Sequence, residues 1–487
     1  MAETSITISG IKYIVDTGLA KELRFDPQRN MNSLEVQLIS KSSAEQRKGR
    51  AGRTSAGKCY RLYTETIQES MPSRTLPEIL RMHLAHAALK LFEFGVTDIL
   101  AFDFVEPPDS VTLKAAVKTL EFVGAIKKDE SAVSEVRVEA GCSRLTDVGR
   151  KMALLPLDPL LAKVLLDGIE AGIGLECAIT VALSSLAGSV FFRGGTDEMK
   201  TESDKRKLQF SHQLGDQMTY LSVYYHWESQ GKNRRTQWCV ENYINAKSMR
   251  IVEETVKELK AILSQHLKII LPAKLACLEN AERKLPKMFF EAFIHNIGIF
   301  IGHQKAGYMT ESIPGESLII FPASALCQLN EFPKYIVYEK TLRTSQHFLL
   351  QVAPVKEEWV REAVESMKLQ HDPAEQFRHY IVTPTTITNI GNRVFKFAIW
   401  KHLQEIREDM KITCNMAPVV IEPVEDQGLV TLFSQSCYHG QVRSLVEKRL
   451  VSERERLRKE YVECGVTMKE EDNVRLVVGS GGIIQHD

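Results

Sequence analysis

The chain has 487 residues, and its 62 Lys and Arg residues balance its 62 Asp and Glu residues, so the formal net charge is zero. With 25% charged and 44% hydrophobic residues, the composition is that of a globular protein of about three or four domains. These values exclude a disordered tail, a collagen-like chain, a disulfide miniprotein and a uniformly basic nucleic-acid binder, but they allow a local basic site.

Cysteine usage and hydropathy indicate the cellular compartment. The nine cysteines are scattered and form no CxxC pair, which argues against a zinc site or a disulfide framework. Scattered thiols in a chain of this size are typical of the cytoplasm or nucleus. The first ten residues do not form a signal peptide. The longest uncharged run, residues 177–192, is shorter than the ~20 apolar residues of a membrane span, so it predicts a buried helix and no membrane partner.

The first 70 residues have the pattern of an α/β segment. Apolar residues alternate with polar ones over 6–8 and 34–38, and turn-forming residues separate these runs. This predicts a β-hairpin across about 23–39. Residues 42–45, Ser-Ser-Ala-Glu, match a capping box and predict that a helix begins there.

The next 80 residues predict two amphipathic helices, over 80–94 and 113–123, and then a strand over 133–138. Two helices followed by a short strand pair resemble a winged-helix module. His83 and His86 have a spacing that could ligate a metal, but no partner is evident in the sequence, so no metal site is predicted.

The rest of the chain changes from helices to strands. Residues 150–280 are helix-rich, with a long periodic segment over 238–266 and a polar, loop-like insert over 194–207. Short strands over 285–360 predict a small β-barrel or sandwich. A solvated helix follows at 441–463. Residues 474–484 read as a strand and a Gly-rich turn, which suits either a nucleotide- or RNA-binding module, such as a KH-like one, or a simple hairpin.

One basic segment departs from the neutral average. Residues 41–61 contain seven Lys and Arg residues and a single acid. Gln46, Arg50 and Arg53 are spaced i, i+4, i+7 and would share one helix face, and the glycines between them allow close approach of a ligand. Two guanidiniums and an amide suit the phosphates of a nucleotide. A solvated basic helix, or a binder of phosphate backbones, explains the spacing equally well.

The wider sequence resembles the DEAH-box RNA helicases. AETSITISGIKYIVDTG at 2–18 and ISKSSAEQRKGRAGRT at 39–54 resemble motifs V and VI of that family. The pattern continues with GKCYRLYTE at 57–65, LTDVGRKMALLPLDPLLAK at 145–163 and FPASAL at 321–326, so the resemblance covers about residues 1–360. Ser9, Phe321 and Ala323 depart from the family pattern, which predicts weaker nucleotide and RNA contacts at those positions.

The resemblance implies a multidomain fold that is α/β, then α, then β. The expected parts are a partial second RecA-like α/β domain (1–70), a winged helix (71–150), a helical ratchet bundle (151–280), an OB-fold-like β-barrel (281–385) and a C-terminal extension (386–487).

It also implies a mechanism and its residues. Such helicases couple ATP hydrolysis to movement along RNA. Gln46, Gly49, Arg50 and Arg53 would contact the ATP phosphates, with both arginines acting as catalytic arginine fingers. Three further residues would link the nucleotide site to the RNA backbone: Thr4, Ser5 and Thr7. The hairpin at about 23–39 would lie where the family separates strands.

Two motifs of the family have no counterpart in the sequence. Neither GxxxxGK[ST] nor Asp-Glu-Ala-His occurs, so we expect a C-terminal fragment whose Mg²⁺ ligands lie upstream and which is inactive by itself. The alternative is a non-catalytic product that binds RNA or a protein.

The expected partners are single-stranded or duplex RNA and activator proteins at the OB-fold. Candidates for base stacking are Tyr308, Phe321 and Phe348, for which core packing is the alternative, and Lys305 and Arg343 are candidate surface cations.

Overall fold

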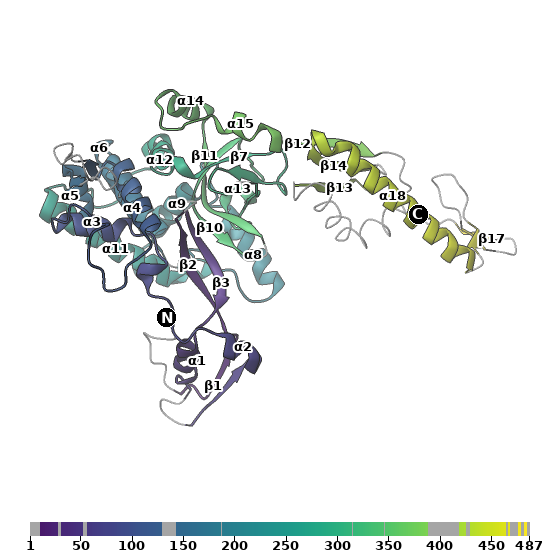
Figure 1. The fold of residues 1–487 in the computed structure, drawn as a ribbon, viewed down its shortest axis with the longest axis horizontal. Coiled ribbons are helices and arrows are strands. Elements are labelled where there is room, and N and C mark those ends of the chain that lie inside the picture. The colour runs from purple at the N-terminus through teal and green to yellow at the C-terminus, as the bar shows by residue number, and fades with distance from the viewer. Residues whose placement is uncertain are drawn as a thin grey trace. The chain divides into compact units, whose positions relative to one another are not determined.

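The computed structural model describes residues 10–27, 31–51, 56–128, 143–186, 188–313, 315–344, 346–387, 418–424, 429–463, 466–467, 476–478 and 482–484. The chain forms two compact units (Figure 1). Unit 1 comprises Met1–Ile294, Phe321–Glu331 and Val337–Pro354, and unit 2 comprises His295–Ile320, Phe332–Ile336 and Val355–Asp487. The fold mixes helices and sheets, as the sequence predicts for a multidomain α/β protein.

Unit 1 begins with a small α/β segment. Strand β1 (Tyr13–Asp16) pairs in parallel with β4 (Lys58–Arg61), and helices α1 (Lys41–Lys48) and α2 (Glu65–Ser70) belong to the same segment. A small apolar core holds it together, with partly buried Ala20 and Tyr63 packed against it; its buried members are Ile39, Ala44 and Met71. The other face of the strand pair leaves Val15 and Tyr60 exposed.

The predicted hairpin is confirmed, although it begins at Leu19 rather than at residue 23. Strand β2 (Leu19–Asp26) pairs antiparallel with β3 (Met31–Leu38) in continuous register. Strand β3 also pairs in parallel with β10 (Tyr335–Arg343), from Thr341 opposite Ser33 to Arg343 opposite Glu35. Strand β11 (His347–Val355) lies on the far side of β10. The hairpin therefore extends the sheet that contains β10 and β11 (Figure 1).

The next segment contains two helices and a strand pair, as predicted. Its elements are η1 (Glu78–Leu80), α3 (Ala85–Glu93), α4 (Ser110–Phe122), β5 (Ile126–Lys128) and β6 (Ser143–Leu145). The two strands are antiparallel, and the Asp109 side chain caps α4 by accepting from the Val111 N–H. The strand predicted over 133–138 lies outside the described residues. The winged-helix assignment stays a prediction.

A helical bundle forms the largest part of unit 1. Its helices are α5 (Asp147–Ala153), α6 (Pro159–Glu170), α7 (Gly174–Ser184), α8 (Asp197–Leu208), α9 (Asp216–Ser229), α10 (Arg235–Glu241), α11 (Ala246–Leu267), α12 (Glu279–Ala292) and α13 (Ala325–Gln328). Every residue of α7 except Glu176 is buried. The buried helix predicted in the uncharged run 177–192 is therefore confirmed as far as Ser184, after which the chain leaves the helix.

The bundle corrects two predictions. Most of the polar loop expected over 194–207 is helical and belongs to α8, because Thr196 caps this helix, acids occupy its first turn and bases its last. Arg193 also pairs with Asp204 through two guanidinium nitrogens, at 2.9 and 3.0 Å. The periodic segment over 238–266 divides into α10 and α11, because Asn245 caps a new helix with its side chain.

Unit 2 combines short strands with short helices. Strand β7 (Ile297–Phe300) pairs antiparallel with β8 (Tyr308–Thr310). The other elements of this part are η3 (Ile294–Asn296), β9 (Ile319–Ile320), α14 (Glu357–Glu365), α15 (Pro373–Gln376) and η4 (Arg378–Tyr380). These strands agree with the strand-rich character predicted for 285–360. The OB-fold assignment stays a prediction.

The C-terminal part of unit 2 has its own sheet, ordered β12 (Val382–Ile387), β14 (Leu429–Gln435), β13 (Val420–Val424), with η7 (Ser436–Tyr438) after β14. Helix α18 (His439–Glu463) confirms the predicted solvated helix. Strand β15 (Val466–Thr467) pairs with β16 (Leu476–Val478), and β16 pairs antiparallel with β17 (Gly482–Ile484), which favours the hairpin interpretation of 474–484.

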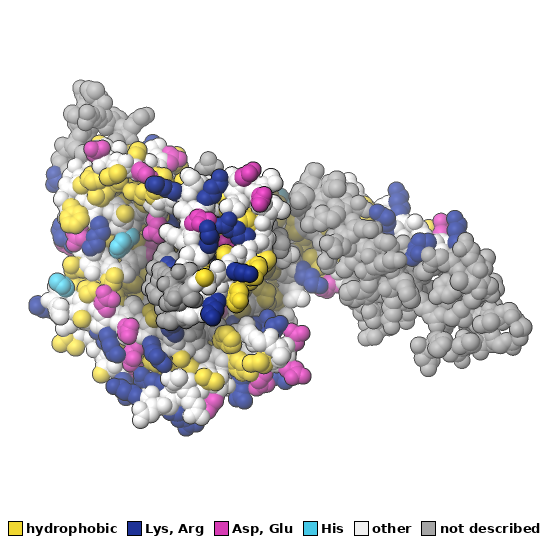
Figure 2. All heavy atoms as spheres, turned by 90° about the horizontal axis from the view of Figure 1, so that it is seen from below, with side chains coloured by type: hydrophobic (Ala, Val, Ile, Leu, Met, Phe, Trp, Pro, Cys, Tyr) yellow, Lys and Arg dark blue, Asp and Glu magenta, His cyan; other side chains and the backbone are white. Residues whose placement is uncertain are grey.

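The helices and the surface show two further properties, one concerning membrane-spanning segments and one concerning the distribution of charge. Across the described ranges, no helix combines the length and the apolar character that crossing a membrane requires. On the face in Figure 2, the basic and acidic side chains of the described residues are interspersed rather than gathered by sign. A phosphate-binding site on this face would therefore consist of a few particular side chains rather than a broad basic patch.

Candidate functional site

Helix α1 begins earlier than the sequence predicts. Ser40 is the N-cap, and its hydroxyl accepts a hydrogen bond from the Ser43 N–H at 3.1 Å. The capping box expected at 42–45 is therefore wrong. Glu45 instead accepts from Lys48 at 2.9 Å and from Arg61 at 2.7 Å. These hydrogen bonds, Lys48 first, hold the pKa of the Glu45 carboxyl below its usual value.

The helix also ends before the predicted arginine face is complete. Its last residue is Lys48, and Gly49 is the C-cap. The Arg50 N–H bonds to the Arg47 carbonyl at 3.0 Å, which is the i to i+3 bonding of a tightened last turn. Gln46 and Arg50 therefore do not share one face of a regular helix, because Arg50 lies in the turn that follows.

The candidate phosphate contacts differ in exposure. Gln46 and Gly49 are exposed, and Arg50 is partly buried. Arg53 lies outside the described residues. The same holds for the predicted RNA-coupling residues Thr4, Ser5 and Thr7.

Arg47 faces the interior although it stands in the middle of the basic segment. Its guanidinium Nη1 lies 2.8 Å from Oδ1 of Asp16, whose side chain has 0% exposure. The same nitrogen donates to the Leu19 carbonyl at 3.2 Å. Asp16 also accepts from the Gly18 N–H at 3.1 Å and from the Tyr63 hydroxyl at 3.3 Å. This buried ion pair joins α1 to the end of β1, and the sequence did not indicate it.

The hairpin is held where β2 approaches its tip. The Phe25 N–H donates to the Arg81 carbonyl at 2.8 Å, and Arg81 Nη1 donates to the Leu23 carbonyl at 3.3 Å. The Phe25 ring packs on His83, with ring centroids 4.4 Å apart. Burial lowers the pKa of His83. His83 also hydrogen-bonds Thr119 at 3.3 Å through Nε2.

The remaining sequence candidates occupy ordinary structural positions. Tyr308 is fully buried, and its hydroxyl donates to the Pro333 carbonyl at 3.0 Å, so it packs in the core and is not available for base stacking. Phe321 and Phe348 are partly buried and meet edge to face at 5.6 Å. Lys305 lies 3.6 Å from Glu422.

Arg343 is exposed. His86 Nδ1 lies 3.0 Å from the Leu157 carbonyl. Among the residues that the structure describes, no three His, Cys, Asp or Glu side chains form a group that could hold a metal ion.

Sequence reasoning missed a buried carboxylate in the helical bundle. Asp216 follows Gly215 at the start of α9 and is 4% exposed. Its Oδ1 accepts from the Ser324 hydroxyl at 3.0 Å and from the Ala325 N–H at 2.8 Å, and its Oδ2 accepts from the Val352 N–H at 2.9 Å. Burial raises the pKa of Asp216, and these hydrogen bonds oppose the rise. The serine of FPASAL therefore faces the protein interior.

A second missed carboxylate is Glu339, a buried acid that directly follows the apolar residues at the start of β10. Its Oε1 accepts from the Ser184 hydroxyl at 2.9 Å and from the Gln217 amide at 2.8 Å. Its Oε2 is buried and meets no hydrogen-bond partner among the residues that the structure describes. Burial raises the pKa of Glu339, and the nearby Lys340 lowers it. The only signal in the sequence is a charged residue inside a buried strand.

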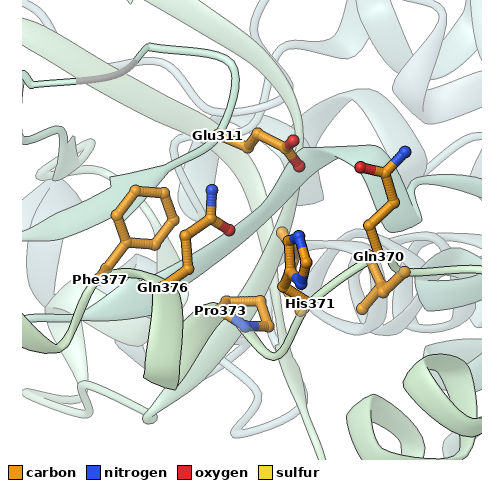
Figure 3. Close-up of a pocket in the computed structure, with 8 residues that line it drawn as sticks. Glu311, Gln370, His371, Pro373, Gln376 and Phe377 are labelled. Carbon is orange, nitrogen blue, oxygen red and sulfur yellow. The ribbon is translucent and has the colours of Figure 1, made fainter.

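Unit 2 contains a small pocket whose lining includes Glu311, His371, Gln376 and Phe377 (Figure 3). Its internal volume of about 10 Å³ is roughly the room that one water molecule needs. A nucleotide does not fit there, so the α1 segment remains the candidate site.

Three relatives represent what comparison with known proteins finds for this chain. It is 30% identical over 497 aligned positions to "ATP-dependent RNA helicase DEAH11, chloroplastic" of Arabidopsis thaliana, covering 100% of the chain and 27% of that protein. It is 35% identical over 354 positions to "ATP-dependent RNA helicase DEAH12, chloroplastic" of the same plant, covering 72% of the chain and 19% of that protein.

The third relative is "Pre-mRNA-splicing factor ATP-dependent RNA helicase prp22" of Schizosaccharomyces pombe. It is 34% identical over 365 positions, which cover 74% of the chain and 29% of that protein. The chain thus spans less than a third of the length of each of these relatives. No protein-family model matches it.

Proposed function

Because this chain belongs to the DEAH-box RNA helicase family, we propose that it supplies part of an ATP-dependent RNA helicase. That enzyme couples ATP hydrolysis to movement along RNA and to the unwinding of RNA. The region of about residues 1–70 provides the phosphate-contacting part, and the parts that follow provide the RNA path.

The proposal rests on which side chains of α1 face solvent and which are held in the interior. The inner side of α1 is fixed by Arg47, while Gln46 and Gly49 face solvent next to the turn that contains Arg50. Amide and guanidinium groups are suitable donors to phosphate oxygens. Gln46, Arg50 and Arg53 contact the β- and γ-phosphates of ATP, and the close approach at Gly49 leaves room for them.

The two arginines act as arginine fingers. A guanidinium at the γ-phosphate stabilises the negative charge that develops as the phosphoryl group is transferred. The described residues offer donors for phosphate but no group of carboxylates for Mg²⁺. The ATP phosphates and residues from elsewhere in the enzyme therefore coordinate the magnesium ion.

The hairpin β2–β3 acts on RNA as a rigid separator of strands. Two kinds of contact support this proposal: the backbone pairing of β3 with β10, and the contacts of Phe25 with Arg81 and His83. A hairpin held along one strand and near its tip resists bending when a duplex is drawn against it. Thr4, Ser5 and Thr7 link the RNA backbone to the nucleotide site.

The other roles rest on the family resemblance. Residues 71–150, 151–280 and 281–385 are the winged helix, ratchet and OB-fold, and the last of these receives activator proteins. Partly buried Phe321 and Phe348 and exposed Arg343 are the aromatic and basic groups available to single-stranded RNA. The enzyme works in the cytoplasm or nucleus.

The test uses the longer protein that contains this chain, with Arg50→Ala compared with Lys48→Ala. Both positions lie at the end of α1, and Lys48 pairs only with exposed Glu45 among the contacts described here. Arg50→Ala is expected to lower kcat for RNA-stimulated ATP hydrolysis by about 10³-fold. Lys48→Ala is expected to change it less than about twofold.

Equal effects of the two substitutions would contradict the phosphate role of Arg50. If the unmodified protein binds RNA but has no RNA-stimulated turnover, the chain belongs to a non-catalytic RNA-binding protein.

A further inference from the structure

Asp16 lies at a junction of four backbone segments. It ends β1, its Oδ1 accepts from Arg47 of α1 and from the Gly18 N–H of the turn before β2, and its Oδ2 accepts from Tyr63, which follows β4. All these groups meet at a carboxylate that is wholly screened from solvent. The charge of a carboxylate in such a place has to be matched by a partner, and Arg47 provides it.

The basic residues of this segment therefore fall into different environments. Arg47 is 22% exposed and pairs with an acid of 0% exposure, whereas Lys48 pairs with Glu45, and both of those side chains are 57% exposed. The sequence shows these cations as one run of positive charge. In the structure Arg47 is directed to the interior, where it cannot reach a nucleotide that contacts the exposed side of α1.

Arg47 is also joined to the residues that we assign to the phosphates. It directly follows Gln46, and its carbonyl accepts the Arg50 N–H at 3.0 Å. Successive residues of a helix differ by about 100° in direction. Fixing the direction of Arg47 toward Asp16 therefore fixes the rotation of α1 about its axis, the outward direction of Gln46 and the place of the Arg50 turn.

The turn before β2 supports the same geometry. Gly18 has φ +72°, and a side chain there would meet the Tyr63 ring at 2.6 Å. The glycine lets the turn pass close to Tyr63, so that the Gly18 N–H and the Tyr63 hydroxyl reach Asp16 together. Two neutral donors, the Gly18 N–H and the Tyr63 hydroxyl, thereby hold the carboxylate in addition to Arg47.

We propose that Asp16 is a positioning residue for ATP hydrolysis: by holding Arg47, it sets the orientation in which Gln46 and Arg50 meet the nucleotide phosphates. This inference rests on the proposed function and deepens it. An arginine finger acts on the transition state, so misplacing it lowers kcat and leaves the KM for ATP nearly unchanged. A pair that only stabilised the fold would lower the amount of active protein and leave kcat per folded molecule as it was.

The experiment uses the longer protein that contains this chain and the variants Asp16→Asn, Arg47→Gln and the double variant. Each single variant is expected to lower kcat per folded molecule roughly 10- to 100-fold, with KM for ATP within about threefold, as a displacement of about 1 Å of a catalytic group does. The double variant is expected to be no worse than the worse single variant, because both substitutions remove one interaction. The matched control, Lys48→Gln, breaks the exposed pair of the same helix and is expected to stay within about twofold.

The folded fraction is measured by thermal unfolding, and Arg47→Lys, which keeps the charge but loses the guanidinium fork, replaces any variant that does not fold. Unchanged kcat per folded molecule in Asp16→Asn and Arg47→Gln would overturn the proposal. So would additive losses in the double variant. If Arg50→Ala itself leaves turnover intact, the proposed function fails instead, so the two failures are distinguishable.

Discussion

Asp16 and Glu339 are both buried carboxylates of unit 1, but their partners differ. Asp16 receives the guanidinium of Arg47 at 2.8 Å. Glu339 receives only neutral donors directly, the Ser184 hydroxyl and the Gln217 amide, and both reach the same oxygen. Within the described part of the chain its other oxygen meets no hydrogen-bond partner, and burial raises the pKa of Glu339. The first site matches its carboxylate with a cation, whereas burial at the second site disfavours the charged form of the carboxyl.

The difference shows that burial alone does not determine whether a carboxylate orients a cation or only accepts hydrogen bonds. At Asp16 the negative charge orients a cation and the helix that carries it. At Glu339 one oxygen works as a hydrogen-bond acceptor, which an amide could do equally well. Asp216 is intermediate, because it is fully buried but accepts three hydrogen bonds, all of them from neutral donors. Replacing each carboxylate with a neutral group should therefore have different and even opposite consequences.

The largest effect is expected at Asp216. Asp216→Ala leaves the Ser324 hydroxyl and the N–H groups of Ala325 and Val352 without their acceptor inside the protein. Each buried donor that loses its partner costs about 1–3 kcal/mol, so the loss of unfolding free energy should be about 3–5 kcal/mol. Urea unfolding of the chain measures it. Asp204→Ala, which removes an exposed ion pair with Arg193, is the control and should cost less than about 1 kcal/mol; similar losses at both sites would refute the special role of Asp216.

Asp16→Asn should be the next most damaging change. It removes the buried carboxylate charge that faces the mostly buried Arg47 guanidinium, and we expect a loss of about 3 kcal/mol in unfolding free energy. Hydrogen exchange of the α1 amides should become faster as well, because α1 loses its attachment to β1. A loss no larger than that of Lys48→Gln would show that the ion pair is not a structural partner of α1.

Gly18→Ala tests whether the turn beside Asp16 has to remain close to Tyr63. The new side chain meets both an unfavourable φ and the Tyr63 ring, and we expect a loss of about 2 kcal/mol in unfolding free energy. Gly124 is a matched control, since its φ of +71° is nearly the same and none of the described residues lies within 4 Å of an added side chain. Gly124→Ala should cost about 1 kcal/mol. Equal costs at the two glycines would mean that the contact with Tyr63 does not constrain the turn.

The smallest effect, and the one of opposite sign, is expected for Glu339→Gln. The amide keeps the acceptor for Ser184 and Gln217 and removes the buried charge of the carboxylate. A gain of about 1 kcal/mol in unfolding free energy is expected at pH 8.

The pH dependence of this gain follows from the raised pKa of Glu339. A carboxyl with a raised folded-state pKa contributes its full stability below its unfolded pKa of about 4.3, and that contribution is lost as pH rises through the folded-state pKa. The advantage of Gln should therefore be small near pH 4 and grow as pH rises. Thermal unfolding of both forms between pH 4 and pH 8 measures it, and a gain independent of pH would mean that Glu339 does not ionise in this range.

Patterns of local polarity predicted much of the secondary structure. The hairpin, the buried helix α7 and the solvated helix α18 follow from alternation, an uncharged run and mixed charges. Helix α8 was missed because a polar segment has no apolar period, while its helicity comes from the Thr196 cap and from charges placed to suit the helix dipole. The start of α1 was misplaced because 42–45 matched a capping box, but Ser40 is fixed by Thr75, at 3.0 Å, from a distant part of the sequence.

The sequence by itself determined the family, since an ordered series of motifs does not depend on how the chain folds, and it identified the residue types that suit phosphate at 46–53. Only the tertiary structure decided what each cation of the basic segment does. Arg47 and Lys48 are neighbours with the same charge, but one meets a carboxylate at 0% exposure and the other a carboxylate at 57%. The strength of an ion pair depends on its exposure to water and on partners that are 31 positions away in the chain, and neither can be read from a run of letters.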